Sequence, residues 1–292
     1  MRKFHLILLQ LAICCHVGLL KAANHKGQVH EPQNFKNISL ISEDSTDVEK
    51  KNNFKISTTG GNNLIQKGKK SQKQQYYLTP TLGYSHKSGL YANLSSTYLA
   101  NQGKKPWDDV SIGTGYGHSF GDHFSMDVDY SYGHYFSSKQ VASSEANSLT
   151  LSTSWNGNIL APSLSANYSF GEVKDITYDL GLSHSFDFTG IFGKTDALSI
   201  PVNFGSSAGT SNFYQNYVKK NSIKKKNGTT VSPNEINTSF RLTTVSFGTG
   251  ITYTNHHLSY VFTINYTEST NNVSNIVLNK IPEITIGLVY SI

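Results

Sequence analysis

Four aspartates in the middle of the chain have spacings that favour a shared chemical role. Asp127 and Asp129 are two residues apart, and Asp179 and Asp187 are eight apart. In an extended strand, residues at even separations point to the same face. Carboxylates that face a narrow aqueous passage concentrate cations there. The alternative is that these groups are solvated, or pair with lysines inside a filled structure.

Histidines beside serines offer a second chemistry, hydrolysis. His118 precedes Ser119 and His184 precedes Ser185, and a hydrolase needs a histidine within hydrogen-bonding reach of its nucleophile. Consecutive strand residues point to opposite faces, so neither pair forms directly in an extended chain. We predict that the histidines at 256–257 form a polar turn and no metal site, because we find no further ligands for a metal ion. We therefore expect no enzyme, no metal and no cofactor.

A group of lysines could bind phosphate. It lies in a long polar stretch and could recognise lipopolysaccharide phosphates by charge, or simply solubilise a loop. We expect no nucleic-acid partner, because the net charge of +6 comes from the first 74 residues; from Gln75 onward there are thirteen basic and fourteen acidic residues. The lysines of this group are Lys219, Lys220, Lys224, Lys225 and Lys226.

The elements that must position these groups are β-strands. Bulky and small residues alternate from about Tyr76 to Ile292, as in the segment 124–134, where Phe, Met, Val and Tyr alternate with Ser, Asp and Gly. Such alternation gives one apolar and one polar face. Many strands of this kind predict an all-β fold, an antiparallel transmembrane β-barrel with lipid outside and water inside.

Eleven strands can be read directly, and single-chain bacterial barrels almost always have an even number. A weak strand around Phe54 is the candidate for the twelfth, so we expect about 12 strands, with 10 as the alternative. A slip in the alternation near Thr244 predicts a β-bulge. The eleven segments are 78–84, 90–98, 110–120, 124–136, 149–155, 164–170, 176–188, 198–204, 245–253, 258–266 and 284–292.

The connections alternate in length. HKSG, FGDH, NGN and TNHH are short, whereas ANQGKKPWDD, SSKQVASSEANS, the stretch 208–236 and STNNVSNIVLNK are long; FGEVKD is a short connection on the long side. Outer-membrane barrels have short periplasmic turns and long external loops. The long connections should therefore face the cell exterior.

The N-terminus predicts export. Arg2 and Lys3 precede an apolar stretch that ends in small residues, which is typical of a signal peptide over 1–22. Lipidation of Cys14 is the alternative. Residues 23–74 are polar and predict a disordered or weakly structured periplasmic leader, followed by the barrel over 75–292.

The segments YLTPTLGYSHKSGLYANLSSTYL and DDVSIGTGYGHSFGDHFSMDVDYSYGHYF resemble the hairpins of a porin family of uncharacterised Gram-negative barrels. The resemblance covers roughly residues 76 to 190. It implies an outer-membrane location, contact with outer-membrane lipid, and insertion by the barrel-assembly machinery. That machinery usually reads a C-terminal aromatic residue, whereas this chain ends in Ile292 with Tyr290 in phase.

Together these features predict a porin-like passive channel for small solutes. One alternative is a non-conducting barrel, packed inside, with a structural or surface-interaction role. An outer-membrane hydrolase is a further alternative. A secreted β-sandwich fits less well, because the hairpins are too close together to cross between two sheets.

Overall fold

The computed structural model describes most of the chain after residue 50. The described residues are 51–62, 65–66, 69–70, 76–100, 106–136, 146–157, 159–222, 225, 228–270 and 282–292. The expected signal peptide, Cys14 and most of the expected leader lie outside these residues.

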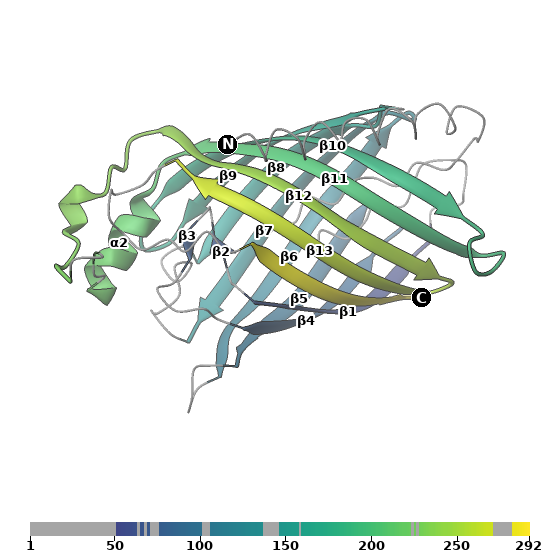
Figure 1. The fold of residues 1–292 in the computed structure, drawn as a ribbon, viewed down its shortest axis with the longest axis horizontal. Coiled ribbons are helices and arrows are strands. Elements are labelled where there is room, and N and C mark those ends of the chain that lie inside the picture. Colours follow the sequence, from purple (N-terminus) through teal and green to yellow (C-terminus); the bar gives the residue numbers. More distant parts are fainter. Residues whose placement is uncertain are drawn as a thin grey trace, which may run out of the picture.

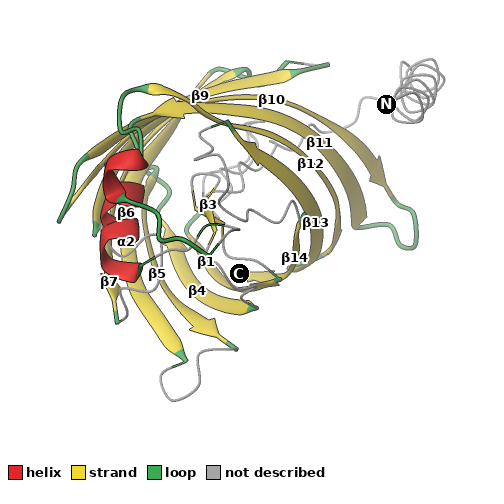
Figure 2. Cartoon of the chain, turned by 60° about the vertical axis from the view of Figure 1, so that its left-hand side comes forward, coloured by secondary structure: helices red, strands yellow, loops and turns green. Residues whose placement is uncertain are grey.

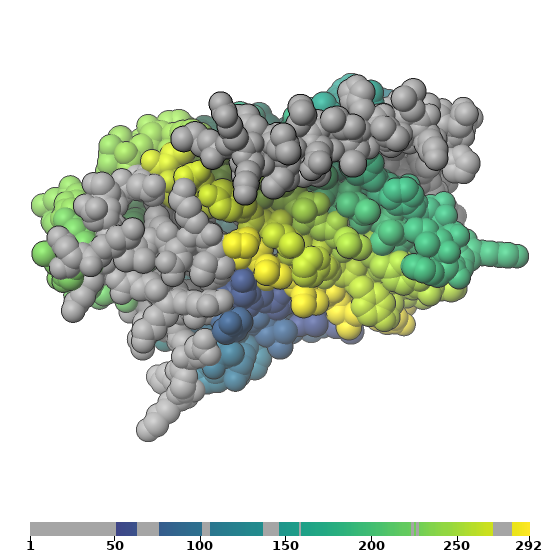
Figure 3. All heavy atoms as spheres, in the orientation of Figure 1, coloured from purple at the N-terminus to yellow at the C-terminus, as the bar shows by residue number. Residues whose placement is uncertain are grey.

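Twelve antiparallel strands form one closed barrel (Figure 1). Each strand pairs with its neighbour in sequence, and the last strand pairs with the first. In Figure 3 the yellow C-terminal strand lies beside the dark blue N-terminal one. The strands are β1 (Asn53–Gly61), β4 (Tyr77–Ser85), β5 (Leu90–Leu99), β6 (Trp107–Phe120), β7 (Phe124–Tyr135), β8 (Asn147–Trp155), β9 (Ala161–Phe170), β10 (Asp175–Thr189), β11 (Asp196–Gly209), β12 (Arg241–Asn255), β13 (Leu258–Ser269) and β14 (Glu283–Ser291).

The expectation of twelve strands is confirmed, and the weak segment around Phe54 is the missing strand. β1 pairs with β4 along one edge and with β14 along the other. Phe54 and Ile292 exchange backbone hydrogen bonds of 3.0 and 2.9 Å. The barrel therefore begins at Asn53, before the boundary at residue 75 that composition suggested. The strand has little apolar alternation of its own, because only Phe54 and Ile56 are large apolar residues and the rest of the strand is threonine, serine and glycine after Lys55.

The remaining elements are short. They are the two-stranded hairpin β2 (Ile65–Gln66) and β3 (Lys69–Lys70), the helix α2 (Asn212–Asn221) and the 3₁₀ helix η2 (Pro233–Glu235). Figure 2 shows the β2–β3 hairpin inside the ring of strands. Among the residues that the structure describes, no helix is long and apolar enough to cross a membrane.

The two ends of the barrel differ in their connections. One end, which we call the turn end, carries the short connections 86–89, 121–123, 156–160, 190–195 and 256–257, together with the start of β1 and the end of β14. The other, the loop end, carries 62–76, 100–106, 136–146, 171–174, 210–240 and 270–282. The expected alternation of short and long connections is confirmed, including the short 171–174 connection at the loop end.

Two β-bulges lie near the loop end. Ser207 pairs with Thr244 and Ala208 with Leu242, so Thr243 is the extra residue, as the sequence predicted. A second bulge was not predicted: Thr97 pairs with Asp109 and Tyr98 with Trp107, which leaves Asp108 extra. A bulge changes the face to which a side chain points. Asp108 is buried as a result, whereas Trp107 stays exposed on the outer face.

Glycines on β6 provide room for larger side chains from neighbouring strands. A Cβ added at Gly115 would lie 2.4 Å from the Tyr91 ring and 2.6 Å from the Val128 carbonyl oxygen. A Cβ at Gly113 would lie 2.5 Å from the Asn93 side chain. The small residues of β6 therefore leave space on the inner face, which the side chains of Tyr91 and Asn93 fill.

We predict that Gly115→Ala destabilises the barrel by about 1–3 kcal/mol, because the added methyl group meets both a ring and a backbone carbonyl. The measurement is the temperature at which the folded band on an unheated detergent gel changes to unfolded mobility. Gly193→Ala is the control, since Gly193 lies in an exposed turn with no atom near its added Cβ. Equal shifts for the two variants would contradict the prediction.

Candidate functional site in the barrel lumen

The outer face of the barrel is apolar along its whole width. Aromatic side chains gather on it near both ends, as in the girdles that lie at the two membrane interfaces. Exposed residues of the middle band include Leu94, Ile112, Val128, Leu149, Leu164, Leu180, Phe204, Phe247 and Phe262; those of the two girdles include Trp107, Phe136, Tyr168, Phe240 and Tyr266 at the loop end and Tyr84, Phe120, Trp155, Phe188, Tyr260 and Tyr290 at the turn end. A closed barrel with such a surface is stable only in lipid.

This chain is an outer-membrane β-barrel.

The inner face is hydrophilic and lined by small groups. Serine hydroxyls on neighbouring strands hydrogen-bond to each other on this face. These bonds give the partly buried hydroxyls a partner within the protein. They include Ser95 with Ser111 at 2.6 Å, Ser125 with Ser154 at 2.6 Å, Ser131 with Ser148 at 2.7 Å, and Ser185 with Ser199 at 2.6 Å.

Asp127 and Asp129 meet a tyrosine from β5 on this face. The Tyr91 hydroxyl donates a hydrogen bond to Asp127 Oδ1 at 2.9 Å and lies 3.4 Å from Asp129 Oδ2. The ring reaches them across Gly115 of β6, which pairs with both Tyr91 and Asp129. A tyrosine, a glycine and a carboxylate pair thus connect three consecutive strands. The two carboxylates are half-buried and face the lumen together.

A second tyrosine repeats this arrangement on the neighbouring strands β4, β1 and β14, at the loop end of the barrel. Tyr77 of β4 lies across Gly61 of β1, whose added Cβ would meet the ring at 2.7 Å. Its hydroxyl donates to Glu283 Oε1 of β14 at 3.2 Å. Sequence reasoning missed Glu283, because it follows a stretch without alternation. The register of β1 brings Tyr77 and Glu283 together, although they are 206 residues apart.

Asp179 and Asp187 lie on β10, three strands away from β7. Ser165 donates to Asp179 Oδ2 at 3.3 Å, and the Ser207 hydroxyl donates to Asp179 Oδ1. Ser185 donates to Asp187 Oδ1 at 2.9 Å. The four aspartates are therefore held by hydroxyls in two separate groups.

The strands carry far more acidic than basic side chains. All twelve are described, and their only basic residues other than histidine are Lys55 and Arg241. Arg241 lies at the loop end, where its Nη2 donates to the Asn237 carbonyl at 3.1 Å. The acidic residues are Asp108, Asp109, Asp127, Asp129, Asp175, Asp179, Asp187, Asp196, Glu268 and Glu283.

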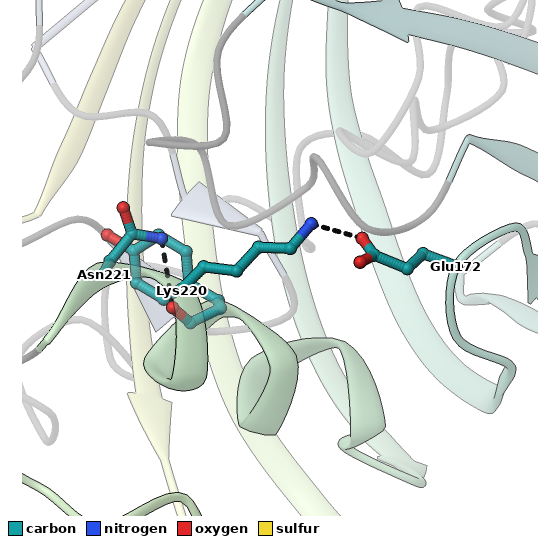
Figure 4. Close-up of polar contacts among 4 residues, drawn as sticks. Glu172, Lys220 and Asn221 are labelled. Carbon is teal, nitrogen blue, oxygen red and sulfur yellow. Dashed lines mark hydrogen bonds and ion pairs between the residues drawn. The ribbon is translucent and has the colours of Figure 1, made fainter.

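The lysine cluster is partly neutralised by neighbouring carboxylates. Lys220 forms an ion pair with Glu172 (Figure 4), and Lys225 forms one with Glu235 at 2.6 Å. The hydrogen bond from Lys220 lowers the pKa of Glu172, and the bond from Lys225 does the same for the pKa of Glu235. Lys219 is exposed. Lys224 and Lys226 lie outside the described residues. The structure thus leaves fewer free cations for phosphate than the sequence suggested.

The loop that carries these lysines has a hydrophobic core of its own. Four residues of α2 pack with Val231 and Ile236, and Val173 of the 171–174 connection covers them. Burial raises the pKa of Tyr214 to about 12. Figure 1 shows α2 beyond the loop end of the strands. The helical residues of this core are Phe213, Tyr214, Tyr217 and Val218.

Asp175 fastens this loop to the barrel. Its carboxylate accepts hydrogen bonds from the backbone N–H groups of Asn212 at 2.9 Å and Phe213 at 2.7 Å, and also from the Thr210 hydroxyl. The first N–H groups of a helix have no partner within the helix, and a negative charge there also suits the helix dipole. The helix-capping residue Ser211 makes no side-chain cap bond, so Asp175 of β10 takes that role.

His118 and His184 pack against aromatic rings, whereas His86 bonds to the Ser88 hydroxyl at 2.8 Å in an exposed turn. His118 packs edge-on against Phe120 at 4.6 Å between ring centroids, and His184 against Phe186 at 4.5 Å. Ser185 instead bonds to inner-face groups. The 256–257 pair forms the turn between β12 and β13. Within the described ranges no three His, Cys, Asp or Glu side chains are grouped as a metal site would require.

No family profile matches this chain, and no curated protein matches it significantly. Among solved structures, the KdgM porin in complex with disordered oligogalacturonate has a TM-score of 0.47 at 11% identity, over 82% of this chain and 99% of that one. The NanC porin has a TM-score of 0.47 at 10% identity, over 80% and 98%. LpxR from Salmonella typhimurium has a TM-score of 0.42 at 11% identity, over 82% and 99%. These similarities are too low to transfer a function.

We predict that Asp175→Asn loosens the α2 loop without unfolding the barrel, because the helix loses a charged cap worth about 1 kcal/mol. Trypsin should then cleave beside Lys219 and Lys220 roughly fivefold faster, with an unchanged gel shift on heating. Asp179→Asn is the control, since Asp179 bonds inner-face serines. Equal cleavage rates in the two variants would show that Asp175 does not hold the helix.

Proposed function

We propose that the protein is a porin-like passive channel for small hydrophilic solutes. The observation that supports this most is the inner face of the barrel, which carries mainly serine, threonine, asparagine and glycine. Eight strands already enclose enough space for side chains to fill, and diameter grows with strand number. Twelve strands with such small inner residues leave room for water. The apolar outer face holds this polar interior across the membrane.

The turn end faces the periplasm and the loop end faces the exterior. Short turns at the periplasmic side and long loops outside are general in outer-membrane barrels, and both ends of the barrel sequence then lie in the periplasm. Lipid contacts the outer face, and the barrel-assembly machinery inserts the chain. Lipopolysaccharide is a partner of the α2 loop chiefly through Lys219, because Lys220 and Lys225 already have carboxylate partners.

The channel prefers cations mildly. Asp127, Asp129, Asp179 and Asp187 supply negative charge to the inner face, and acidic groups in a narrow aqueous passage raise the local concentration of cations. Acid groups outnumber basic groups in the strands, so the preference is spread along the lumen.

A non-conducting barrel is the second candidate, and one observation favours it. The β2–β3 hairpin lies within the ring of strands in the view of Figure 2, where it would reduce the open cross-section. A barrel obstructed in this way would have a structural or surface-interaction role, carried by its outer loops, including the compact α2 loop. Conductance separates the two functions.

We predict that the purified protein conducts in planar lipid bilayers, and that the double variant Asp127→Asn, Asp129→Asn lowers the cation-to-anion permeability ratio roughly two- to fivefold, since two nearby charges are lost. Reversal potentials in a potassium chloride gradient give the ratio. Asp122→Asn is the matched control, because Asp122 is exposed in the turn after β6.

Absence of conductance in the wild-type protein, with the gel shift on heating intact, would rule out the channel and leave the packed barrel. A conducting protein whose double variant keeps the wild-type ratio would rule out this carboxylate pair as a source of selectivity.

A further inference from the structure

Lys55 is a buried cation on the inner face of the barrel. Its neighbours Phe54 and Ile56 are exposed on the outer face, whereas only 5% of Lys55 is exposed. Alternation along β1 therefore points its side chain inward. Its Nζ is buried and has no hydrogen-bond partner among the residues that the structure describes.

The strand register places Lys55 near Tyr91, whereas the carboxylate pair of β7 is four strands from Lys55 around the ring. Lys55 pairs with Gly83 of β4, and Gly83 pairs with Asn93 of β5. Asn93 is one inner-face position from Tyr91, whose hydroxyl bonds Asp127. Lys55 therefore lies two strands from Tyr91, in the same half of the lumen, near the turn end.

A buried ammonium group without a partner is unfavourable, because it loses hydration and gains no opposing charge. An ionisable group at membrane depth therefore points to a functional role. Asp127 and Asp187 lie four and five strands from Lys55 around the ring, and each is already bonded to a hydroxyl, Asp127 to that of Tyr91 and Asp187 to that of Ser185. Three N–H donors of Lys55 remain available for a ligand of negative charge.

We propose that Lys55 binds small anions in the lumen, either inorganic anions or the carboxylate group of a solute, and so limits the cation preference of the channel. This proposal rests on the proposed function and names the residue that opposes the carboxylates. It gives the lumen a cationic position near the turn end, four strands from the acidic pair of β7.

The test is the permeability ratio of Lys55→Gln in planar bilayers. Loss of the ammonium charge should raise the cation-to-anion ratio about threefold, as expected for one charge in an aqueous passage. Lys55→Arg should keep the wild-type ratio, because it retains the charge. Lys87→Gln is the matched control, since Lys87 is exposed in the turn that joins β4 and β5 at the same end. An unchanged ratio in Lys55→Gln overturns the proposal.

Binding can also be measured without conduction. In detergent-solubilised protein labelled with ¹⁵N-lysine, titration with acetate should shift one side-chain signal that is absent from Lys55→Gln. If the wild-type protein does not conduct, the channel is ruled out, and this titration still decides the role of Lys55. No acetate-dependent signal from Lys55 overturns anion binding. Should Lys55→Gln fail to fold, the wild-type titration and Lys55→Arg remain decisive.

Discussion

The pairing of β1 with β14 is the constraint on which the whole structure depends. In the hydrocarbon core no water is available to hydrogen-bond free N–H and C=O groups, so an open sheet edge would leave many of them without partners. The bonds between Phe54 and Ile292, and the register that continues from Lys55 with Ser291 to Gly61 with Thr285, remove that edge. Closure also defines an inside and an outside, which gives the alternating side chains their opposite surroundings.

Closure makes the inner face a place where distant segments meet. Tyr77 and Glu283 interact only because β1 lies between β4 and β14, and Tyr91 reaches Asp127 only because Gly115 leaves space. Both tyrosines extend over a glycine and end at a carboxylate. Such contacts connect three strands through side chains as well as backbone, and they hold the acidic groups at defined positions on the lumen surface.

The loop end has its own organisation. Asp175 caps α2, and a small hydrophobic core keeps the helix compact. The lysines that looked free in the sequence are partly neutralised, because folding brings Glu172 and Glu235 next to Lys220 and Lys225. This loop therefore presents a more structured and less basic surface than its composition suggests.

Alternation along the chain was enough to predict the barrel, its outer face, the bulge beside Thr244 and eleven of the twelve strands, and the even strand number of such barrels predicted the twelfth. Each depends on local spacing, since a strand's two faces follow from its own residues. The same rule put Asp127 and Asp129 on one face. The weak β1 strand was harder to recognise, because Phe54 and Ile56 are its only large apolar residues.

Only the tertiary structure decided which groups meet. The partners of Asp175, Glu283 and Lys220 are 38, 206 and 48 residues away, and no local pattern encodes such separations. The Asp108 bulge and the burial of Lys55 likewise depend on neighbouring strands. The sequence by itself determined the barrel and the polarity of its two faces, because alternation is local. Register and closure decided the lumen's contacts, because these are set by pairing between strands.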